Sequence, residues 1–353
     1  MNIKNIFIPN DFKISIDKRE LFLLVRPFFK KNSWAQEGEM FHEWNFDQKE
    51  FNLTKKIEDS SFLLIPYPIN YYFETNSMHI IKNYSQLCMS YNINGYGYIS
   101  GDYPKYYKEF KNITYFRMGG YRSKLSEKNQ GFPAALTDQF LKIYKKEKII
   151  LRKKKEIPVV GFCGLASNNL ITKTKQNIKY IIDTIDNNSN PFKKNIYQPK
   201  FNSAYERFSI LKQIEESEHI DTNFIFRNQY RGGAITKDQY KKTTLEYYDN
   251  IINSDYIFCL RGYGNFSVRL YETLMMGRIP IFLNTDCLLP FPKLIKWKDH
   301  VVWIEWEEKD KVADIIKAFH RKISEKDFRQ RQTNNRKLWN EILKPKWILR
   351  NLI

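Results

Sequence analysis

The clearest indication of the fold of this 353-residue chain is the stretch SDYIFCLRGYGNFSVRLYETLMMGRIPIFLNTDCLLPF, residues 254–291. Its apolar pattern predicts a buried strand at 256–260, a glycine-containing turn, a helix at 267–276 and a second buried strand at 279–283. Gly277 stands where a helix C-cap belongs. Alternating strands and helices indicate a parallel sheet covered by helices, and therefore an α/β fold.

The turn and the start of this helix have the features of an anion site. Gly262 and Gly264 allow a ligand to approach the backbone closely. Either Asn265 or Ser267 is a suitable N-cap residue for the helix. Free N–H groups and the positive end of the helix dipole favour a diphosphate at such a position.

Arg269 and Glu272 lie three residues apart and therefore share one face of the helix. The arginine could chelate phosphate oxygens, and the glutamate could accept hydrogen bonds from two ribose hydroxyls. The alternative is an ordinary surface pair, which contributes little to stability. The spacing does not decide between them, and no Gly-x-Gly-x-x-Gly fingerprint stands beside the helix.

The rest of the chain is predicted to alternate strands and helices on both sides of a basic segment. This segment, KKEKIILRKKK at residues 145–155, is either a solvated linker or a contact with anionic lipid head groups. Before this segment we expect strands at 3–8, 21–25, 61–66, 95–100 and 113–116 and a helix at 134–148. After it we expect strands at 157–167, 223–226 and 301–306 and helices at 204–218, 237–253 and 312–323. The loops expected at 34–44 and 76–97 would set specificity.

The charge balance points to an anionic partner. Lys and Arg number 58 against 39 Asp and Glu, a formal net charge of +19. This excess favours an anionic membrane surface, nucleic acid or phosphate-bearing substrates. A general bias toward Lys, Asn and Ile would explain the charge equally well. The aromatic share of 16% excludes a disordered chain.

Features of export are missing from the sequence. The apolar runs are too short to span a bilayer, and MNIKNIFIPNDF lacks the pattern of a signal peptide. Four scattered cysteines argue against a zinc site or a disulfide framework: Cys88, Cys163, Cys259 and Cys287. We therefore expect a cytoplasmic protein.

The order of residues in 254–291 resembles the donor-binding signature of the exostosin-like glycosyltransferases, family 47. The matching positions are Ser254, Phe258-Cys259-Leu260, Gly262, Gly264, Ser267, Arg269, Glu272, Gly277, Ile279-Pro280-Ile281 and Leu289-Pro290-Phe291. Two further segments resemble the family more weakly: residues 61–66 resemble its N-terminal strand ending in proline, and residues 161–164 resemble the loop that opens its nucleotide domain. Arg261 replaces the usual proline and Arg278 the usual cysteine, which leaves the donor preference open. The composition suggests a bacterial member.

The resemblance implies a GT-B architecture, in which two Rossmann-like domains face a central cleft. Residues 1–150 would bind the acceptor and residues 157–325 the nucleotide sugar, while the helical tail 326–353 would pack back on the first domain. Ser267 and Arg269 would meet the diphosphate and Glu272 the ribose. Because ligands lie beyond the carboxyl ends of strands, further donor-binding candidates are Gly164, Arg227, Arg261, Gly264 and Asn265.

The resemblance implies an inverting hexosyl- or pentosyltransferase that needs no cofactor besides its nucleotide-sugar co-substrate. No Asp-x-Asp metal motif occurs, so we expect no metal and expect arginines and helix N-termini to stabilise the leaving group. The catalytic base expected is Asp102, which follows a predicted strand, although a turn-forming Asp would look the same. Its rivals are Glu37, Glu39, His42 and Asp138.

The expected acceptor is a surface polysaccharide, a lipopolysaccharide or a lipid-linked glycan, reached by a cytoplasmic enzyme held peripherally at the anionic inner membrane. A non-catalytic glycan-binding or nucleic-acid-binding protein is the alternative. Nucleic acid is the weaker partner, because no helix-turn-helix, zinc-finger or RNP-type signature appears. Retention of both Arg269 and Glu272 argues against a module that only binds glycan.

Overall fold

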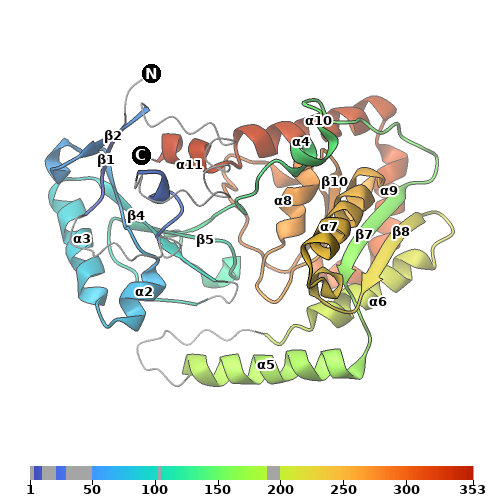
Figure 1. Cartoon of the computed structure of the whole chain (residues 1–353), viewed down its shortest axis with the longest axis horizontal. Coiled ribbons are helices and arrows are strands. Elements are labelled where there is room, and N and C mark those ends of the chain that lie inside the picture. The colour runs from blue at the N-terminus through green and yellow to red at the C-terminus, as the bar shows by residue number, and fades with distance from the viewer. Residues whose placement is uncertain (1–3, 10–20, 29–49, 102–104, 189–198, 353) are drawn as a thin grey trace.

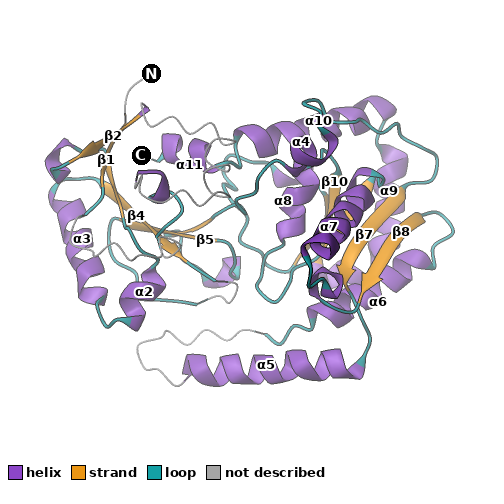
Figure 2. Cartoon of the chain, in the orientation of Figure 1, coloured by secondary structure: helices purple, strands orange, loops and turns teal. Residues whose placement is uncertain are grey.

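A computed structural model describes residues 4–9, 21–28, 50–101, 105–188 and 199–352 of the chain. Within these residues the strands form two sheets, one in each half, and every strand pairing within the sheets is parallel. Helices pack against the sheets in both halves (Figures 1 and 2). The predicted α/β class with two Rossmann-like halves is therefore confirmed at the level of two parallel sheets.

The N-terminal sheet has the strand order β2-β1-β3-β4-β5-β6. Its short strands are rich in aromatic and β-branched residues, and β4 and β5 form its longest ladder, with Gly95 opposite Ile113 and Ile99 opposite Arg117. The strands are β1 (Lys4–Phe7), β2 (Phe51–Thr54), β3 (Phe62–Leu64), β4 (Asn94–Ile99), β5 (Ile113–Arg117) and β6 (Asn129–Gly131), and the helices of this half are α2 (Ile69–Glu74) and α3 (Met78–Ser90). Helix α4 (Gln139–Tyr144), which follows β6 in the chain, packs against the C-terminal half.

The C-terminal sheet has the strand order β11-β10-β9-β7-β8. Its strands are β7 (Val159–Leu165), β8 (Asp221–Arg227), β9 (Tyr256–Cys259), β10 (Ile279–Asn284) and β11 (Val302–Glu305). The helices that follow or precede them are α5 (Leu170–Asn188), α6 (Ser203–Glu215), α7 (Lys237–Ile252), α8 (Val268–Met275), α9 (Val312–Lys322), α10 (Glu325–Glu341) and α11 (Pro345–Asn351). The region predicted from 254–291 thus has the expected strand, helix, strand succession.

Alternation along the strands separates two apolar layers. Ile257 and Cys259 of β9 pack with α7, α8 and α10, whereas Tyr256 and Phe258 pack with α6 and α9. Both faces of the sheet are covered, which explains why β9 and β10 read as continuous apolar runs. None of the described helices has the length and apolar character needed to cross a bilayer.

The C-terminal tail joins the two halves. Helix α10 packs against α8 of the C-terminal half, and Arg336 of α10 forms an ion pair with Asp138. Helix α11 continues to the N-terminal half (Figure 1), where Ile348 and Leu349 are part of the apolar cluster of the first sheet. Arg350 there forms an ion pair with Glu50.

Several sequence expectations are wrong in detail. Residues 21–25 form turns, not a strand, because Phe22 donates its backbone N–H to Pro66 and both sides of the apolar run are buried in the N-terminal half. The helix expected at 134–148 is limited to α4, since Asp138 caps its start and Lys145 ends it with a left-handed φ of 53°. The loop expected at 76–97 contains helix α3 and the start of β4. The loop expected at 34–44 lies outside the described residues.

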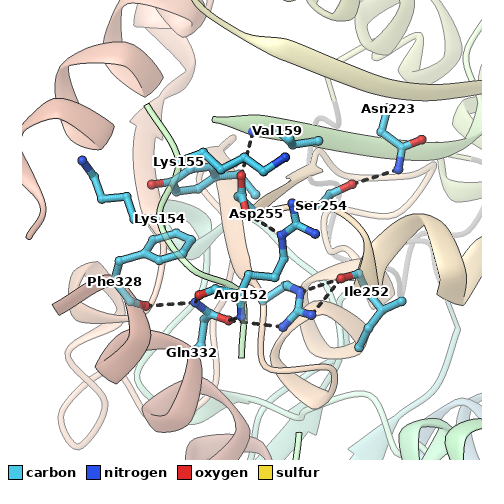
Figure 3. A network of polar contacts seen from close by, with 12 residues as sticks. Arg152, Lys154, Lys155, Val159, Asn223, Ile252, Ser254, Asp255, Phe328 and Gln332 are labelled. Carbon is cyan, nitrogen blue, oxygen red and sulfur yellow. Dashed lines mark hydrogen bonds and ion pairs between the residues drawn. The ribbon is translucent and has the colours of Figure 1, made fainter. Parts of the chain in front are cut away.

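The segment 145–155 is anchored to the C-terminal half by a buried carboxylate (Figure 3). Asp255 is fully buried, pairs with Arg152 and accepts a hydrogen bond from the Val159 backbone at 2.9 Å. Gln332 of α10 bonds both backbone groups of Arg152 at 2.9 Å. Arg278, in the position of the usual cysteine, donates to the Ile252 carbonyl at 2.8 and 3.1 Å. This part of the basic segment is therefore structural.

We expect Asp255→Ala to lower the free energy of unfolding by about 3–5 kcal/mol, because it leaves the mostly buried Arg152 guanidinium without its counter-charge. Urea denaturation followed by circular dichroism measures the change. The control is Glu215→Ala, which breaks the exposed ion pair with Lys212 and should cost less than about 1 kcal/mol. Equal losses in the two variants would contradict this account of the anchor.

Candidate functional site

The C-terminal sheet has one topological switch point, between β7 and β9. Strand β8 lies on one side of β7, and β9, β10 and β11 lie on the other. In sheets of this kind the ligand site lies beyond the carboxyl ends of the strands that flank the switch point. The residues that follow β7 and β9 are therefore the first place to look for a site.

Arg269 reaches this switch point from the first turn of α8. Its Nη2 donates to the Cys163 carbonyl of β7 at 2.8 Å, and its guanidinium lies 4.3 Å from the centre of the Phe162 ring. A Cβ on Gly164 would come within 2.6 Å of the same nitrogen, so a larger residue there would displace the guanidinium from this position. The structure thus brings together Gly164 and Arg269, two of the predicted donor-binding residues.

Arg207 is a site residue that the sequence analysis missed. It projects from α6, and its two terminal nitrogens donate to the carbonyls of Leu165, Leu260 and Arg261, at 3.3, 3.3 and 2.8 Å. It therefore bridges the carboxyl ends of β7 and β9. Burial, and next the positive charge of Arg269, lower the pKa of Arg207 to about 9. The available signal was a cation in register with Ala204, Leu211 and Ile214 on the buried face of the predicted helix.

Arg261 follows β9 directly and is buried. Its guanidinium donates to the Tyr121 hydroxyl and, at 2.8 Å, to the Tyr263 carbonyl, and it lies 4.6 Å from the centre of the Phe201 ring. The position that departs from the family pattern therefore brings one more cation to the switch point.

The three guanidinium groups share an unusual property. Within the described ranges, no ion pair joins Arg207, Arg261 or Arg269 to a carboxylate, and the buried Nε atom of each lacks a hydrogen-bond acceptor. We call this group the arginine cluster. Arg261 is buried and the other two are partly buried. Cations in such surroundings, held by neutral carbonyls and aromatic rings, create a strong positive potential, which an anionic ligand would relieve.

Glu272 lies one helical turn beyond Arg269 and is held by two tyrosines. The hydroxyls of Tyr247 and Tyr248 of α7 donate to its two carboxylate oxygens, the second at 3.2 Å. Burial raises the pKa of Glu272, and the Tyr247 hydrogen bond and the charge of Arg269 partly offset that rise. The carboxylate is thus fixed beside the arginine cluster.

The remaining predicted donor-binding residues differ in what they do. Ser267 is the N-cap residue of α8, but its hydroxyl makes no capping hydrogen bond. Arg227, at the end of β8, is paired with Glu246 at 2.6 Å. Gly264 is buried in the turn before α8.

Asn265 is a structural residue and not an open donor contact. It is fully buried, and its amide nitrogen donates to the carbonyls of Gly120, Thr285 and Asp286 at 2.9–3.2 Å. Its amide oxygen accepts from Thr285 at 2.7 Å. The expectation that it binds the donor is therefore corrected, because these bonds leave its amide nitrogen no free donor.

A cavity of about 440 Å³ opens at the carboxyl edge of the N-terminal sheet. Residues that follow four of its strands line it, together with Arg26 and Tyr71: Pro68 and Asn70 after β3, Ser100 after β4, Met118 after β5, and Phe132 and Pro133 after β6. Asn70 fixes the end of β4 through two hydrogen bonds with Ser100, at 2.9 and 3.1 Å. Glu74 is the carboxylate in the lining, and it pairs with Lys105 at 3.5 Å.

The loops at the two carboxyl edges touch each other. Arg261 and Asn265, which follow β9, contact Tyr121 and Gly120, which follow β5. Tyr121 also forms an isolated antiparallel bridge with Cys287, which follows β10. Met118, which lines the cavity, precedes Tyr121 by only a few residues, and Tyr121 contacts Arg261 of the arginine cluster.

The predicted catalytic base is not among the described residues. Asp102 and its rivals Glu37, Glu39 and His42 lie outside the described residues. The remaining rival, Asp138, caps α4 and pairs with Arg336, so its carboxylate is already engaged in a structural role. Among the residues that are described, no group of three or more His, Cys, Asp or Glu side chains is arranged to hold a metal ion.

The candidate site lies in a region of the chain that matches a known protein family. The model of the exostosin GT47 domain matches residues 121–319, which is more than half of the chain and includes the whole arginine cluster and Glu272. The chain belongs to the exostosin GT47 family. The resemblance inferred from 254–291 is thereby confirmed, while the bacterial origin stays a prediction.

Relatives of the exostosin GT47 chain include plant proteins that match a short region. A probable glycosyltransferase of Arabidopsis thaliana is 30% identical over 78 residues, 22% of this chain and 16% of the relative. A probable glucuronosyltransferase of Oryza sativa subsp. japonica is 31% identical over 70 residues, 20% and 17% of the two chains. A probable beta-1,4-xylosyltransferase of Arabidopsis thaliana is 34% identical over 64 residues, 18% and 15%. The matched region spans about a sixth of these relatives.

We expect Glu272→Gln to leave the stability at neutral pH equal or higher. Because burial holds the pKa of Glu272 above its unfolded value, its ionised form destabilises the fold above that folded pKa. In the wild-type protein this destabilisation disappears as the pH falls through the folded pKa, because Glu272 becomes protonated. Any advantage of the glutamine variant should therefore shrink in acid. Urea denaturation of both proteins between neutral pH and pH 4 measures the difference, and a glutamine variant that is clearly less stable at neutral pH would contradict this expectation.

Proposed function

We propose that this protein is an inverting glycosyltransferase that moves a hexose or pentose from a nucleotide sugar to a glycan hydroxyl. The observation that carries the proposal is the arginine cluster beside Glu272, at the switch point of an exostosin GT47 domain. The plant relatives named above are glycosyl-, glucuronosyl- and xylosyltransferases by name. These names favour the same class of reaction here.

The donor diphosphate would lie over the arginine cluster. Arg269, Ser267 and the first N–H groups of α8 would bind its oxygens. Arg207 and Arg261 would add positive charge at the ends of β7 and β9. Glu272 would accept hydrogen bonds from the ribose hydroxyls while the two tyrosines hold it in place. Gly164 keeps space for the Arg269 guanidinium.

The acceptor would occupy the cavity of the N-terminal half. This cavity opens at the carboxyl edge of its sheet, and loops from that edge touch the loop that carries Arg261. Its aromatic and polar lining suits a sugar ring. We propose a surface polysaccharide, a lipopolysaccharide or a lipid-linked glycan as the acceptor.

The reaction would be a single displacement at the anomeric carbon. A carboxylate takes the proton of the acceptor hydroxyl, the acceptor oxygen forms a bond to the anomeric carbon, and the bond from that carbon to the diphosphate oxygen breaks. The configuration inverts, and the nucleoside diphosphate leaves with the electron pair. The arginine cluster stabilises this developing negative charge, so we propose that a divalent metal is not required.

We expect a nucleoside diphosphate to raise the unfolding temperature of the protein, because it binds only the folded state. UDP, GDP, CDP and ADP are compared by thermal shift. Arg269→Ala should weaken the binding of the preferred compound by about tenfold or more, since a hydrogen bond to a charged group is lost. Arg207→Ala should also weaken it, since positive charge beside the diphosphate is removed.

The matched control is Arg331→Ala. Arg331 also donates to backbone carbonyls, those of Lys298 and Val301, and stacks on Phe319 at 5.2 Å, but it lies on α10 outside the site. Its loss should change stability without changing nucleotide affinity. Absence of binding by every nucleoside diphosphate, or equal affinity in all variants, would overturn the proposed donor site.

The proposed base is tested by comparing two carboxylates. We expect Asp102→Asn to lower kcat for sugar transfer by about 10²–10⁴-fold, because general-base catalysis contributes this much. Glu74→Gln, which changes the carboxylate of the cavity, should alter KM more than kcat. Product formation is measured with nucleotide sugars that include glucuronic acid and xylose donors. The reverse pattern would assign the base to Glu74.

A further inference from the structure

Helix α5 has an exposed apolar face that no described part of the chain covers. Ile178, Ile181, Ile182 and Ile185 are exposed by 52, 54, 59 and 63%. Their spacing of three, four and seven residues places them on one side of the helix. We call these four residues the isoleucine stripe.

The polar side of α5 faces the protein. Gln176, Asn177, Tyr180 and Thr184 are partly buried and recur at helical spacing on the side opposite the stripe. Lys179 lies 4.1 Å from the centre of the Tyr263 ring, in the turn before α8. This orientation is the reverse of a normal surface helix, which turns its apolar side inward. The isoleucine stripe is therefore suited to an apolar partner outside the chain.

We propose that the isoleucine stripe docks α5 on an anionic lipid bilayer. A helix that lies in the membrane interface buries apolar side chains on one side and keeps basic residues beside them. Lys175 and Lys179 are exposed at one edge of the stripe. The whole chain carries a formal net charge of +19. An anionic bilayer complements this charge, whereas a second copy of the chain would repel it.

The position of α5 gives the docking a functional consequence. The helix directly follows β7, and its Lys179 contacts the turn that carries Arg261. Its lower position in Figure 1 shows that it runs along one side of the molecule and not through its core. Docking would hold the carboxyl edge of the C-terminal sheet near the membrane surface, within reach of a substrate carried by a lipid. The proposal does not depend on the glycosyl transfer itself.

Co-sedimentation of the full chain with vesicles tests the proposal. We expect binding to vesicles of equal parts phosphatidylcholine and phosphatidylglycerol, and much weaker binding to phosphatidylcholine alone. Replacing all four isoleucines by glutamine should lower the partition constant by about tenfold or more. Glutamine is chosen because it retains a high helix propensity. Circular dichroism and the unfolding temperature show that the variant is folded.

The matched control also changes four exposed apolar residues to glutamine, in the N-terminal half: Leu53, Leu87, Met89 and Tyr91. It should bind anionic vesicles like wild type. Failure of wild type to bind, or equal binding by the isoleucine variant, would overturn the proposal. Sedimentation equilibrium provides a further test. If wild type and the control variant form a dimer and the variant without the four isoleucines stays monomeric, the stripe binds a second copy of the chain and the proposal is overturned.

Discussion

The site depends on guanidinium groups that neutral partners hold in place. A carboxylate beside Arg207 or Arg261 would fix the side chain equally well, but it would also cancel the charge. Here backbone carbonyls at the ends of β7 and β9 accept the hydrogen bonds, and the rings of Phe162 and Phe201 face Arg269 and Arg261. The cations are therefore preorganised while their charge remains available. Charges fixed in this way can stabilise developing negative charge without reorganisation.

The fold brings the cations together because a parallel sheet presents all its carboxyl ends at one edge. Arg207 comes from α6, Arg261 from the end of β9 and Arg269 from α8, and they meet where the strand order changes direction. The N-terminal sheet places its cavity at the equivalent edge. The buried amide of Asn265 ties the two edges together through Gly120 and Thr285. A residue expected to contact the donor thus instead helps to fix how the edges meet.

Local patterns predicted the elements that carry the chemistry. The succession β9, α8, β10 could be predicted from 254–291, because its apolar periodicity changes clearly from strand to helix and back. The strand predicted at residues 21–25 was wrong, because a short apolar run that is buried on both sides has the same composition whether it forms a strand or turns. The structural role of Arg278 was out of reach, because its partners Ile252 and Gln332 come from distant parts of the chain. Arg207, by contrast, could have been found as a cation on a buried helical face.

A crystal structure with the preferred nucleoside diphosphate shows whether the arginine cluster binds the diphosphate. We expect phosphate oxygens about 3 Å from the Arg269 guanidinium, over the ends of β7 and β9, and ribose hydroxyls hydrogen-bonded to Glu272. A nucleotide bound away from this edge, with no phosphate oxygen near Arg269, would show that the arginine cluster does not hold the diphosphate.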